Sequence, residues 1–217
     1  TYGMHFIDYF PHRELGIIFF ETGDLDAART HLERSLSHYP SAKARFYLDQ
    51  VRRKRIEQSG LPAAPPAITI SDDAPVRWTR QDPVMVQGQV ADTHFVSSVS
   101  IGGTPLFLDG ARQHVQFNVP LELAHGSHAV ALAAANLADR QAEREIVIHV
   151  DRQGPLISLT RIEPVKESQR SVVAIEGVIT DWAGIASARI DDTPIAHAKG
   201  NQIRFSVQVP RTGKPLH

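Results

Sequence analysis

The sequence contains no cysteine. Disulfide bonds, thiolate zinc sites and cysteine nucleophiles are therefore excluded, because each of them needs a thiol. An excess of charge is also missing, since 23 lysines and arginines oppose 24 aspartates and glutamates and leave a net charge of -1. A chain so balanced has no long-range field to gather nucleic acid or an anionic membrane. No run approaches the roughly 18 apolar residues of a transmembrane segment.

The periodicity of apolar residues divides the 217-residue chain into a helical region, a linker and a β region. In residues 1–60 apolar residues recur every three or four positions, which predicts helices. The segment 61–66, Leu-Pro-Ala-Ala-Pro-Pro, predicts a stiff linker because proline removes helix donors. From residue 67 onward, alternating β-branched residues are broken by Gly, Pro and Asp turns, which predicts strands. The domains we expect are 1–60, 61–66, 67–151 and 152–217.

Small and large residues follow a fixed spacing in the first helices. Over residues 9–42 this spacing resembles the tetratricopeptide repeat, a 34-residue helical hairpin. His12 and Ser35 depart from the family pattern. The resemblance implies a helical-hairpin repeat with further repeats upstream, since one repeat cannot bury its own apolar face. The matching residues are Leu15, Gly16, Phe19, Gly23, Ala28, Leu32 and Pro40.

In the tetratricopeptide family the first helix of each pair lines a concave groove that binds proteins. The resemblance therefore implies a protein partner at that groove, where large apolar residues and a cation suit a peptide or helix. An equal alternative is that neighbouring repeats or the β region cover these residues. The groove positions are Phe10, Arg13, Ile17, Phe20 and Glu21.

The β region contains an internal repeat with an offset of about 89 residues. Gly88-Gln-Val-Ala-Asp92 corresponds to Gly177-Val-Ile-Thr-Asp181, and Phe117-Asn-Val119 corresponds to Phe205-Ser-Val207. Strands at intervals of eight to twelve residues are typical of a sandwich of two sheets. The first unit predicts seven strands: 67–71, 84–91, 96–101, 104–108, 114–120, 127–134 and 143–150.

The order of these motifs resembles bacterial immunoglobulin-like modules, including accessory modules beside polysaccharide-degrading catalytic domains. We therefore expect a multidomain chain, α plus all-β, in which a helical-hairpin repeat precedes two immunoglobulin-like β-sandwiches. The second sandwich is expected to be incomplete, because its last two strands would begin near His217. Truncation of a longer protein is the favoured explanation, and a strand donated by a partner or neighbouring subunit is the alternative. Since the chain starts at Thr1, we expect a mature form or a fragment.

Two tryptophans are candidates for stacking on carbohydrate. We expect Trp182 in a turn after Asp181 and Trp78 in a loop between the first two β-region strands. The alternative is that each indole plugs the end of its sandwich. No paired acids, Gly-x-Ser-x-Gly elbow, phosphate loop or His-Glu-x-x-His helix supports catalysis, so no catalytic residue is assigned.

Histidines and aspartates are the candidate metal ligands of this sequence. His125 and His128 flank one predicted turn and His114 is expected on a neighbouring strand, but zinc needs three or four supported ligands. Aspartates gather at the expected module joints, where calcium is the alternative to ordinary turn hydrogen bonding. No Asp-x-Asp-x-Asp loop occurs, and no metal or cofactor is predicted. The aspartates are Asp72, Asp73, Asp92, Asp151, Asp181, Asp191 and Asp192.

These observations favour a non-catalytic scaffold that binds proteins. The resemblance to bacterial immunoglobulin-like modules, which are usually periplasmic or surface-exposed, implies a component of the bacterial cell envelope or an extracellular assembly, exported to the periplasm or cell surface. The alternative function is an accessory region of a larger secreted enzyme, either carbohydrate-binding or regulatory. The basic run Arg52–Arg55 ends a predicted helix and suits its dipole, so nucleic-acid binding is not expected.

Overall fold

The structure is a computed structural model that describes residues 10–72, 74, 76–167, 170–190, 193–195 and 198–210, without the side chains of 166, 167, 170 and 171. It divides into two compact units. The N-terminal unit comprises Thr1–Arg77, Asp82–Leu123 and His128–Ile148. The C-terminal unit comprises Trp78–Gln81, Ala124–Ser127 and His149–His217. Each unit is described by itself below.

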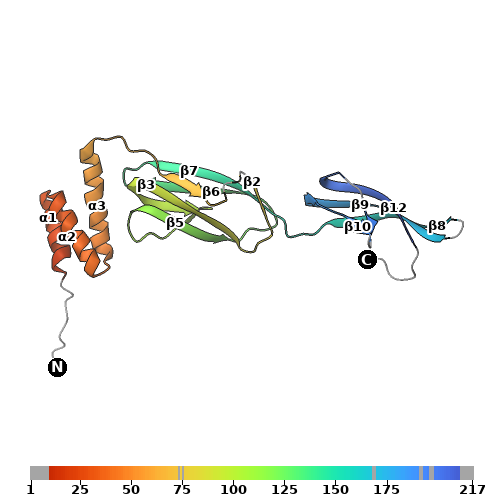
Figure 1. Ribbon diagram of the computed structural model, residues 1–217. Helices are drawn as coiled ribbons and strands as arrows, with labels where there is room; N and C mark the ends of the chain where they lie inside the picture. The colour runs from red at the N-terminus through yellow and green to blue at the C-terminus, as the bar shows by residue number, and fades with distance from the viewer. Residues whose placement is uncertain are drawn as a thin grey trace, which may run out of the picture. The chain divides into compact units, whose positions relative to one another are not determined.

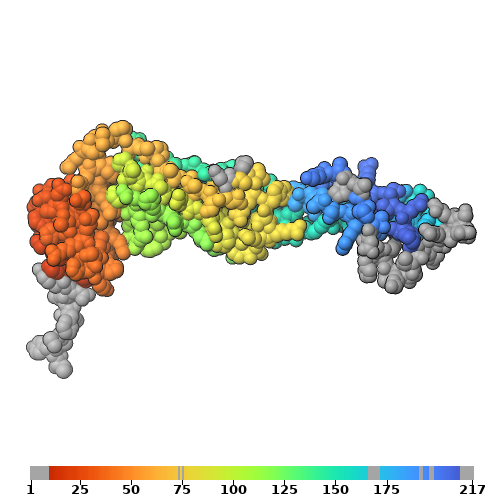
Figure 2. Space-filling view, viewed as in Figure 1, coloured from red at the N-terminus to blue at the C-terminus, as the bar shows by residue number. Residues whose placement is uncertain are grey.

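Three helices begin the N-terminal unit: α1 (Pro11–Thr22), α2 (Leu25–His38) and α3 (Ala42–Ser59). Gly23 ends α1 in a left-handed conformation at φ 88°, which glycine adopts without steric cost. The Asp24 carboxylate then caps α2 by accepting the amide of Ala27 at 3.0 Å. Figures 1 and 2 show the helices packed side by side in red to orange.

Small residues set how closely α1 and α2 approach. A Cβ on Gly16 would lie 2.7 Å from Cγ of Leu32, a distance that real Cβ atoms do not show. Ala28 and Leu32 are fully buried at the same contact. Close packing at the crossing therefore requires glycine at position 16. The buried residues of this helical core are Phe20, Leu25, Ala28, Leu32, Ala44, Leu48 and Val51.

The expected tetratricopeptide repeat is wrong. The described residues hold three helices, and every later regular element is a strand. The spacing that carried the resemblance is the spacing that any close-packed helical hairpin needs, namely small residues at the crossing and a stop after each helix. In addition, α3 makes polar contacts with the β region of the same unit, where Arg52 donates to the carbonyl oxygen of Ala111 at 2.9 Å. Tyr9, the first residue of the resemblance, lies outside the described residues.

A seven-stranded sheet follows the linker. Its order is β1-β3-β6-β7-β2, and β4 and β5 also pair with β3. The strands are β1 (Ala67–Ile70), β2 (Val76–Thr79), β3 (Val84–Ile101), β4 (Thr104–Pro105), β5 (Arg112–Leu121), β6 (Gly126–Asn136) and β7 (Gln141–Val150).

The expected fold of two immunoglobulin-like sandwiches is wrong, and β3 gives the physical reason. Two predicted strands, 84–91 and 96–101, form one strand of 18 residues. Its first part pairs with β1 and β5 and its last part pairs with β6, with register shifts between Ala91 and Ser98. Phe95, at φ 64°, lies in this irregular stretch. Such a bulge bends and twists a strand, so one continuous sheet curls over the core instead of forming two separate sheets.

The C-terminal unit contains a three-stranded sheet of order β12-β9-β8 and a two-stranded sheet, β10-β11. Its buried core is made of Ile175, Ile179, Ile185, Ile195, Ile203, Phe205 and Val209. The strands are β8 (Leu156–Glu167), β9 (Arg170–Ile185), β10 (Arg189–Ile190), β11 (Thr193–Pro194) and β12 (Gly200–Pro210).

The internal repeat corresponds to equivalent pairings in the two β regions. Gly88 lies opposite Ile70 on β1 and Phe117 on β5. Gly177 lies opposite Leu159 on β8 and Phe205 on β12. In both regions a Cβ on the glycine would overlap a backbone carbonyl and the phenylalanine ring. The repeated Gly and Phe are therefore a packing pair, with the ring seated where the glycine has no side chain.

Strand β8 forms one edge of the three-stranded sheet and carries exposed apolar side chains at Leu156, Ile157, Leu159 and Ile162. Exposed apolar edges favour pairing with further strands. The donated strand or neighbouring subunit at this region stays a prediction.

Candidate functional site

Four aromatic rings gather in the C-terminal unit. The rings of Trp78 and Trp182 meet edge to face with centroids 4.9 Å apart. His149 lies 4.5 Å from Trp78 and 5.3 Å from Trp182, and His125 lies 5.4 Å from Trp182. We call these four residues the aromatic cluster. Edge-to-face contacts at these distances are favourable because the positive ring edge meets the negative ring face.

Both tryptophans keep much of their surface in solvent. Trp78 is 44% exposed and Trp182 is 42% exposed. The structure places Trp78 on strand β2 and Trp182 within strand β9, so the predicted loop and turn around them were wrong. A strand holds its side chains more firmly than a loop, which suits a fixed recognition surface.

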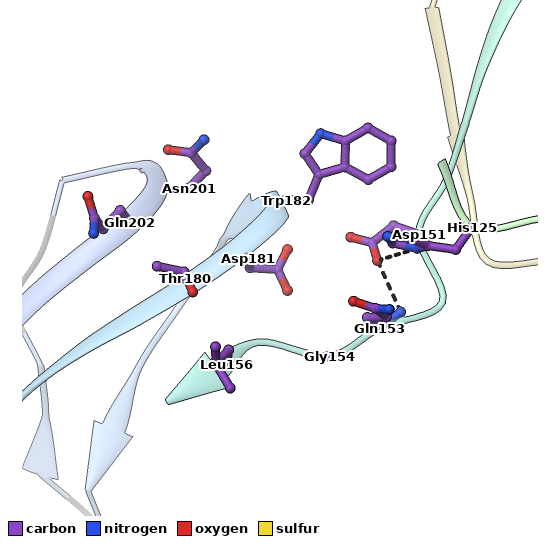
Figure 3. A pocket seen from close by; sticks show the side chains of 10 residues that line it. All are labelled: His125, Asp151, Gln153, Gly154, Leu156, Thr180, Asp181, Trp182, Asn201 and Gln202. Carbon is purple, nitrogen blue, oxygen red and sulfur yellow. Dashed lines mark hydrogen bonds and ion pairs between the residues drawn. The ribbon is translucent and has the colours of Figure 1, made fainter. Parts of the chain in front are cut away.

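A pocket of about 490 Å³ opens beside Trp182 (Figure 3). Its lining combines the indole with carboxylate, amide and hydroxyl groups, and none of the described residues that line it is a lysine or an arginine. Pockets of this size accommodate small molecules. The lining residues are His125, Asp151, Gln153, Gly154, Leu156, Thr180, Asp181, Trp182, Asn201 and Gln202.

Asp151 is buried and holds one wall of this pocket in place. Its carboxylate accepts the backbone amides of Gln153 at 3.0 Å and Ala183 at 3.2 Å. Nδ1 of His125 lies 3.6 Å from the same carboxylate (Figure 3). Because its oxygens accept backbone donors, Asp151 orders the loop before β8 and the segment that follows Trp182.

Asp181 differs from its counterpart in the first repeat. The carboxylate of Asp92 accepts the amide of His94 through one oxygen and the side-chain amide of Asn136, at 3.0 Å, through the other. Asp181 is also buried, but no described residue donates to its Oδ1. In Figure 3 its carboxylate points toward Asp151 across the pocket. A buried acceptor without a donor is costly, so Asp181 favours a ligand that supplies an O–H or N–H group.

The candidate metal ligands do not assemble. Among the described residues, no group of three or more histidines, aspartates or glutamates is placed to hold a metal ion. Asp92 and Asp151 accept backbone amides, which is the turn role that the sequence left open beside calcium. Asp73, Asp191 and Asp192 lie outside the described residues.

The predicted groove residues do not present one open surface. Phe20 is buried, with Tyr47 edge-on to its ring and the Lys54 ammonium 4.0 Å from the ring centroid. Both of these partners come from α3, so this helix covers the position that the family groove would expose. A protein partner at a helical groove is therefore not supported.

The other groove residues are half-buried or exposed, unlike Phe20. The Arg13 guanidinium covers the Phe10 ring at 4.4 Å and also binds the Glu14 carboxylate at 2.8 Å. Ile17 is half-buried on α1, and Glu21 is exposed near the end of that helix.

The basic run Arg52–Arg55 does not end its helix, because α3 continues to Ser59. Arg53 pairs with Asp139 at 2.6 Å and Arg55 pairs with Asp26 at 2.6 Å. Arg52 pairs with Asp49 at 3.1 Å. The run therefore forms ion pairs within the N-terminal unit.

No protein-family model matches the chain, and no curated protein matches it. Two solved structures are similar to parts of it. One is the surface glycan-binding protein SGBP-B of the Bacteroides ovatus mixed-linkage glucan utilization locus, in complex with a mixed-linkage heptasaccharide, at 10% identity and a TM-score of 0.28. The other is apo β-glucuronidase 3 of Bacteroides uniformis, at 14% identity and a TM-score of 0.28.

The first match covers 65% of this chain and 47% of the glycan-binding protein. The second covers 70% of this chain and 22% of the glucuronidase. The chain thus spans about half and about a fifth of the lengths of these proteins. TM-scores this low assign neither a fold nor a function. Among the described residues, no helix is long and apolar enough to cross a bilayer.

Proposed function

We propose that this protein is a non-catalytic carbohydrate-binding module in which Trp78 and Trp182 form the stacking platform. The observation that carries the proposal is the exposed tryptophan pair beside a polar pocket. The C–H groups on the face of a sugar ring carry partial positive charge, and the indole face is negative. A half-exposed indole on a strand therefore offers a rigid, partly apolar surface to a sugar ring.

The polar groups around Trp182 match the other half of sugar chemistry. Amide side chains of Asn201 and Gln202 both donate and accept hydrogen bonds, as sugar hydroxyls do. The open Oδ1 of Asp181 accepts a hydroxyl hydrogen, in the way that Asp92 accepts the amide of Asn136. Apolar stacking and directional hydrogen bonds are thus available together, which is the general composition of a small-molecule site.

This role makes the chain an accessory part that holds a glycan near another activity. Binding without bond chemistry needs no catalytic acid pair. The polysaccharides that such modules bind lie outside the cytoplasm. We therefore propose that the protein is exported and works in the periplasm or at the cell surface.

The test uses the fact that the chain has two tryptophans, both in the aromatic cluster. Tryptophan fluorescence therefore reports on this site without background from elsewhere. We expect a glycan array to identify a ligand that changes this fluorescence on titration. Trp182→Ala should then weaken binding about tenfold or more in calorimetry, because a central aromatic contact contributes about 1–2 kcal/mol.

Phe46→Ala is the matched control, since Phe46 is an exposed aromatic of the N-terminal unit. Its affinity for the glycan should equal that of the wild-type chain. The proposal fails when no arrayed glycan changes the fluorescence, or when Trp182→Ala and Phe46→Ala bind equally well.

A further inference from the structure

The outer face of strands β1, β3 and β5 in the N-terminal unit carries a row of amide and hydroxyl side chains. Inward residues such as Val86 and Val90 are buried, and Gln87 and Gln89 between them point outward and are exposed. The outward positions hold Thr69, Ser71, Gln87, Gln89, Gln116 and Asn118, which we call the amide track. None of these side chains carries a charge.

Strand register places these side chains in two rows. Thr69 pairs with Gln89, and Gln89 pairs with Gln116, so three strands contribute to the first row. Gln87 pairs with Asn118 in the second row. Side chains within a row are about 5 Å apart, and the rows are about 7 Å apart along the strands. The track is therefore a small grid of donors and acceptors on a rigid sheet.

The surface is hollowed along this grid. A cavity of about 470 Å³ lies over the track, and a second cavity of about 590 Å³ begins at Gln116, which lines both. The second cavity is also lined by His114 and Arg112 on β5, by Asp109 and by Phe107. Gln116 lines both hollows, so they are neighbours on this face.

Phe107 is 87% exposed, the highest value among the large apolar residues of the described chain. The segment that carries it is held at both ends. The amide of Leu106 donates to the carbonyl oxygen of Val99 at 2.8 Å, and Asp109 pairs with Arg45 at 3.0 Å and with Arg112. The hydrogen bond from Arg112 is the main reason that the pKa of Asp109 lies below its usual value, which keeps this pair charged. An exposed ring on a fixed segment is ready to stack without ordering cost.

We propose that the amide track and Phe107 form a second glycan-binding surface that takes a neutral, linear polysaccharide. Amides pair with hydroxyls in both directions, so adjacent sugar units meet donors and acceptors along the grid. An exposed aromatic ring at the end of the track stacks on a further sugar ring. The uncharged grid offers no partner for a uronate or sulfate group, which would lose its hydration without compensation. Arg112, which lines the second cavity, is already paired with the carboxylate of Asp109.

Other ligand classes fit this surface less well. Nucleic acid needs lysines and arginines against its phosphates, and the track has none. A peptide that adds a strand uses a free sheet edge, whereas these side chains stand on the sheet face. This second surface and the site around Trp182 share only their ligand class. They lie on different units, so the experiment on one can fail while the experiment on the other succeeds.

The test compares soluble neutral polysaccharides (a β-glucan, a galactomannan and pullulan) with anionic polygalacturonate in affinity electrophoresis. At least one neutral polymer should retard the chain, and polygalacturonate should not. The double variant Gln89→Ala/Gln116→Ala should weaken that binding about tenfold, since it removes two hydrogen-bonding groups of about 0.5–1.5 kcal/mol each. Phe107→Ala should also weaken it.

Gln141→Ala is the control, because Gln141 is an exposed strand glutamine outside both hollows. It should bind like the wild-type chain. The measurements are repeated with Trp78→Ala/Trp182→Ala, which removes the aromatic cluster's platform and should leave retardation measurable. Equal binding by Gln89→Ala/Gln116→Ala and Gln141→Ala overturns the inference, as does loss of all binding in the tryptophan double variant or preference for polygalacturonate.

Discussion

His12 on α1 faces two histidines of α2. Its Nδ1 lies 3.0 Å from Nδ1 of His31, and its ring lies 6.3 Å from the ring of His38. Desolvation lowers the pKa of His12, and the charges of Arg34, His31 and His38 lower it further. His12 therefore binds a proton at a lower pH in the folded chain than in the unfolded chain, where its pKa has the ordinary value of 6.5.

We expect the free energy of unfolding of the helices to decrease as the pH falls below 6.5. The sign follows because the unfolded state binds more protons there than the folded state. Urea denaturation followed by helical circular dichroism, at about pH 7.5 and about pH 5.5, measures this effect. In His12→Phe the difference between the two pH values should shrink. An unchanged difference would show that His12 is not the group responsible.

Single residues show how far the candidate site was predictable. Trp78 and Trp182 were named because exposed aromatics stack on sugars, and the structure brings them together at 4.9 Å. His149 was missed as a neighbour, since nothing in the sequence around position 149 distinguishes it from other strand residues. The cluster draws on four separate segments of the chain. Pairing at such separations depends on tertiary register, which one sequence does not contain.

At the scale of elements, the repeated glycine on β3 and β9 makes a prediction about stability. A Cβ on Gly177 would lie 2.7 Å from the Ser158 carbonyl oxygen and 2.7 Å from Cζ of Phe205, and a Cβ on Gly88 would overlap its own neighbours. We expect Gly88→Ala and Gly177→Ala each to lower the free energy of unfolding by about 1–3 kcal/mol through overpacking.

Gly154→Ala is the matched control, because no atom lies within 4 Å of the Cβ it would add. It should change stability by less than about 0.5 kcal/mol. Tryptophan fluorescence follows the C-terminal unit, so Gly177→Ala should shift that transition to lower urea. Equal stability of Gly177→Ala and Gly154→Ala would refute the packing role of the repeated glycine.

Elements also show which parts of the fold were predictable. Periodicity predicted the helical region, and alternation predicted strands near the observed positions of β1, β5, β6 and β7. The helical-hairpin and sandwich assignments failed because short-range spacing does not specify what an element packs against. The bulge near Phe95 keeps β3 continuous, whereas Asp92 in the sequence is typical of a turn between two separate strands. Strand β2 was missed because it lies in a stretch without clear alternation.

At the scale of the whole molecule, α3 and the β region of the N-terminal unit are joined by a closed set of hydrogen bonds. The Asp49 carboxylate accepts the Ala111 amide at 2.9 Å and the Arg52 guanidinium at 3.1 Å. Arg52 in turn donates to the Ala111 carbonyl oxygen at 2.9 Å. Burial raises the pKa of Asp49, although the Ala111 amide and Arg52 act in the opposite direction. Burying the Asp49 carboxylate therefore costs free energy, and the hydrogen bonds from Ala111 and Arg52 offset that cost.

Removing this carboxylate should uncouple the helices from the β region. Asp49→Ala leaves the part-buried Ala111 amide without its acceptor, and we expect a loss of about 1–3 kcal/mol. Asp49→Asn keeps an acceptor and relieves the desolvated charge, so it should cost less. Helical circular dichroism and hydrogen exchange of the β-strand amides should coincide in the wild-type chain and separate in Asp49→Ala, with the helices unfolding first. Coincident unfolding in Asp49→Ala would mean that the ion pairs of Arg45 and Arg53 suffice to couple the two parts.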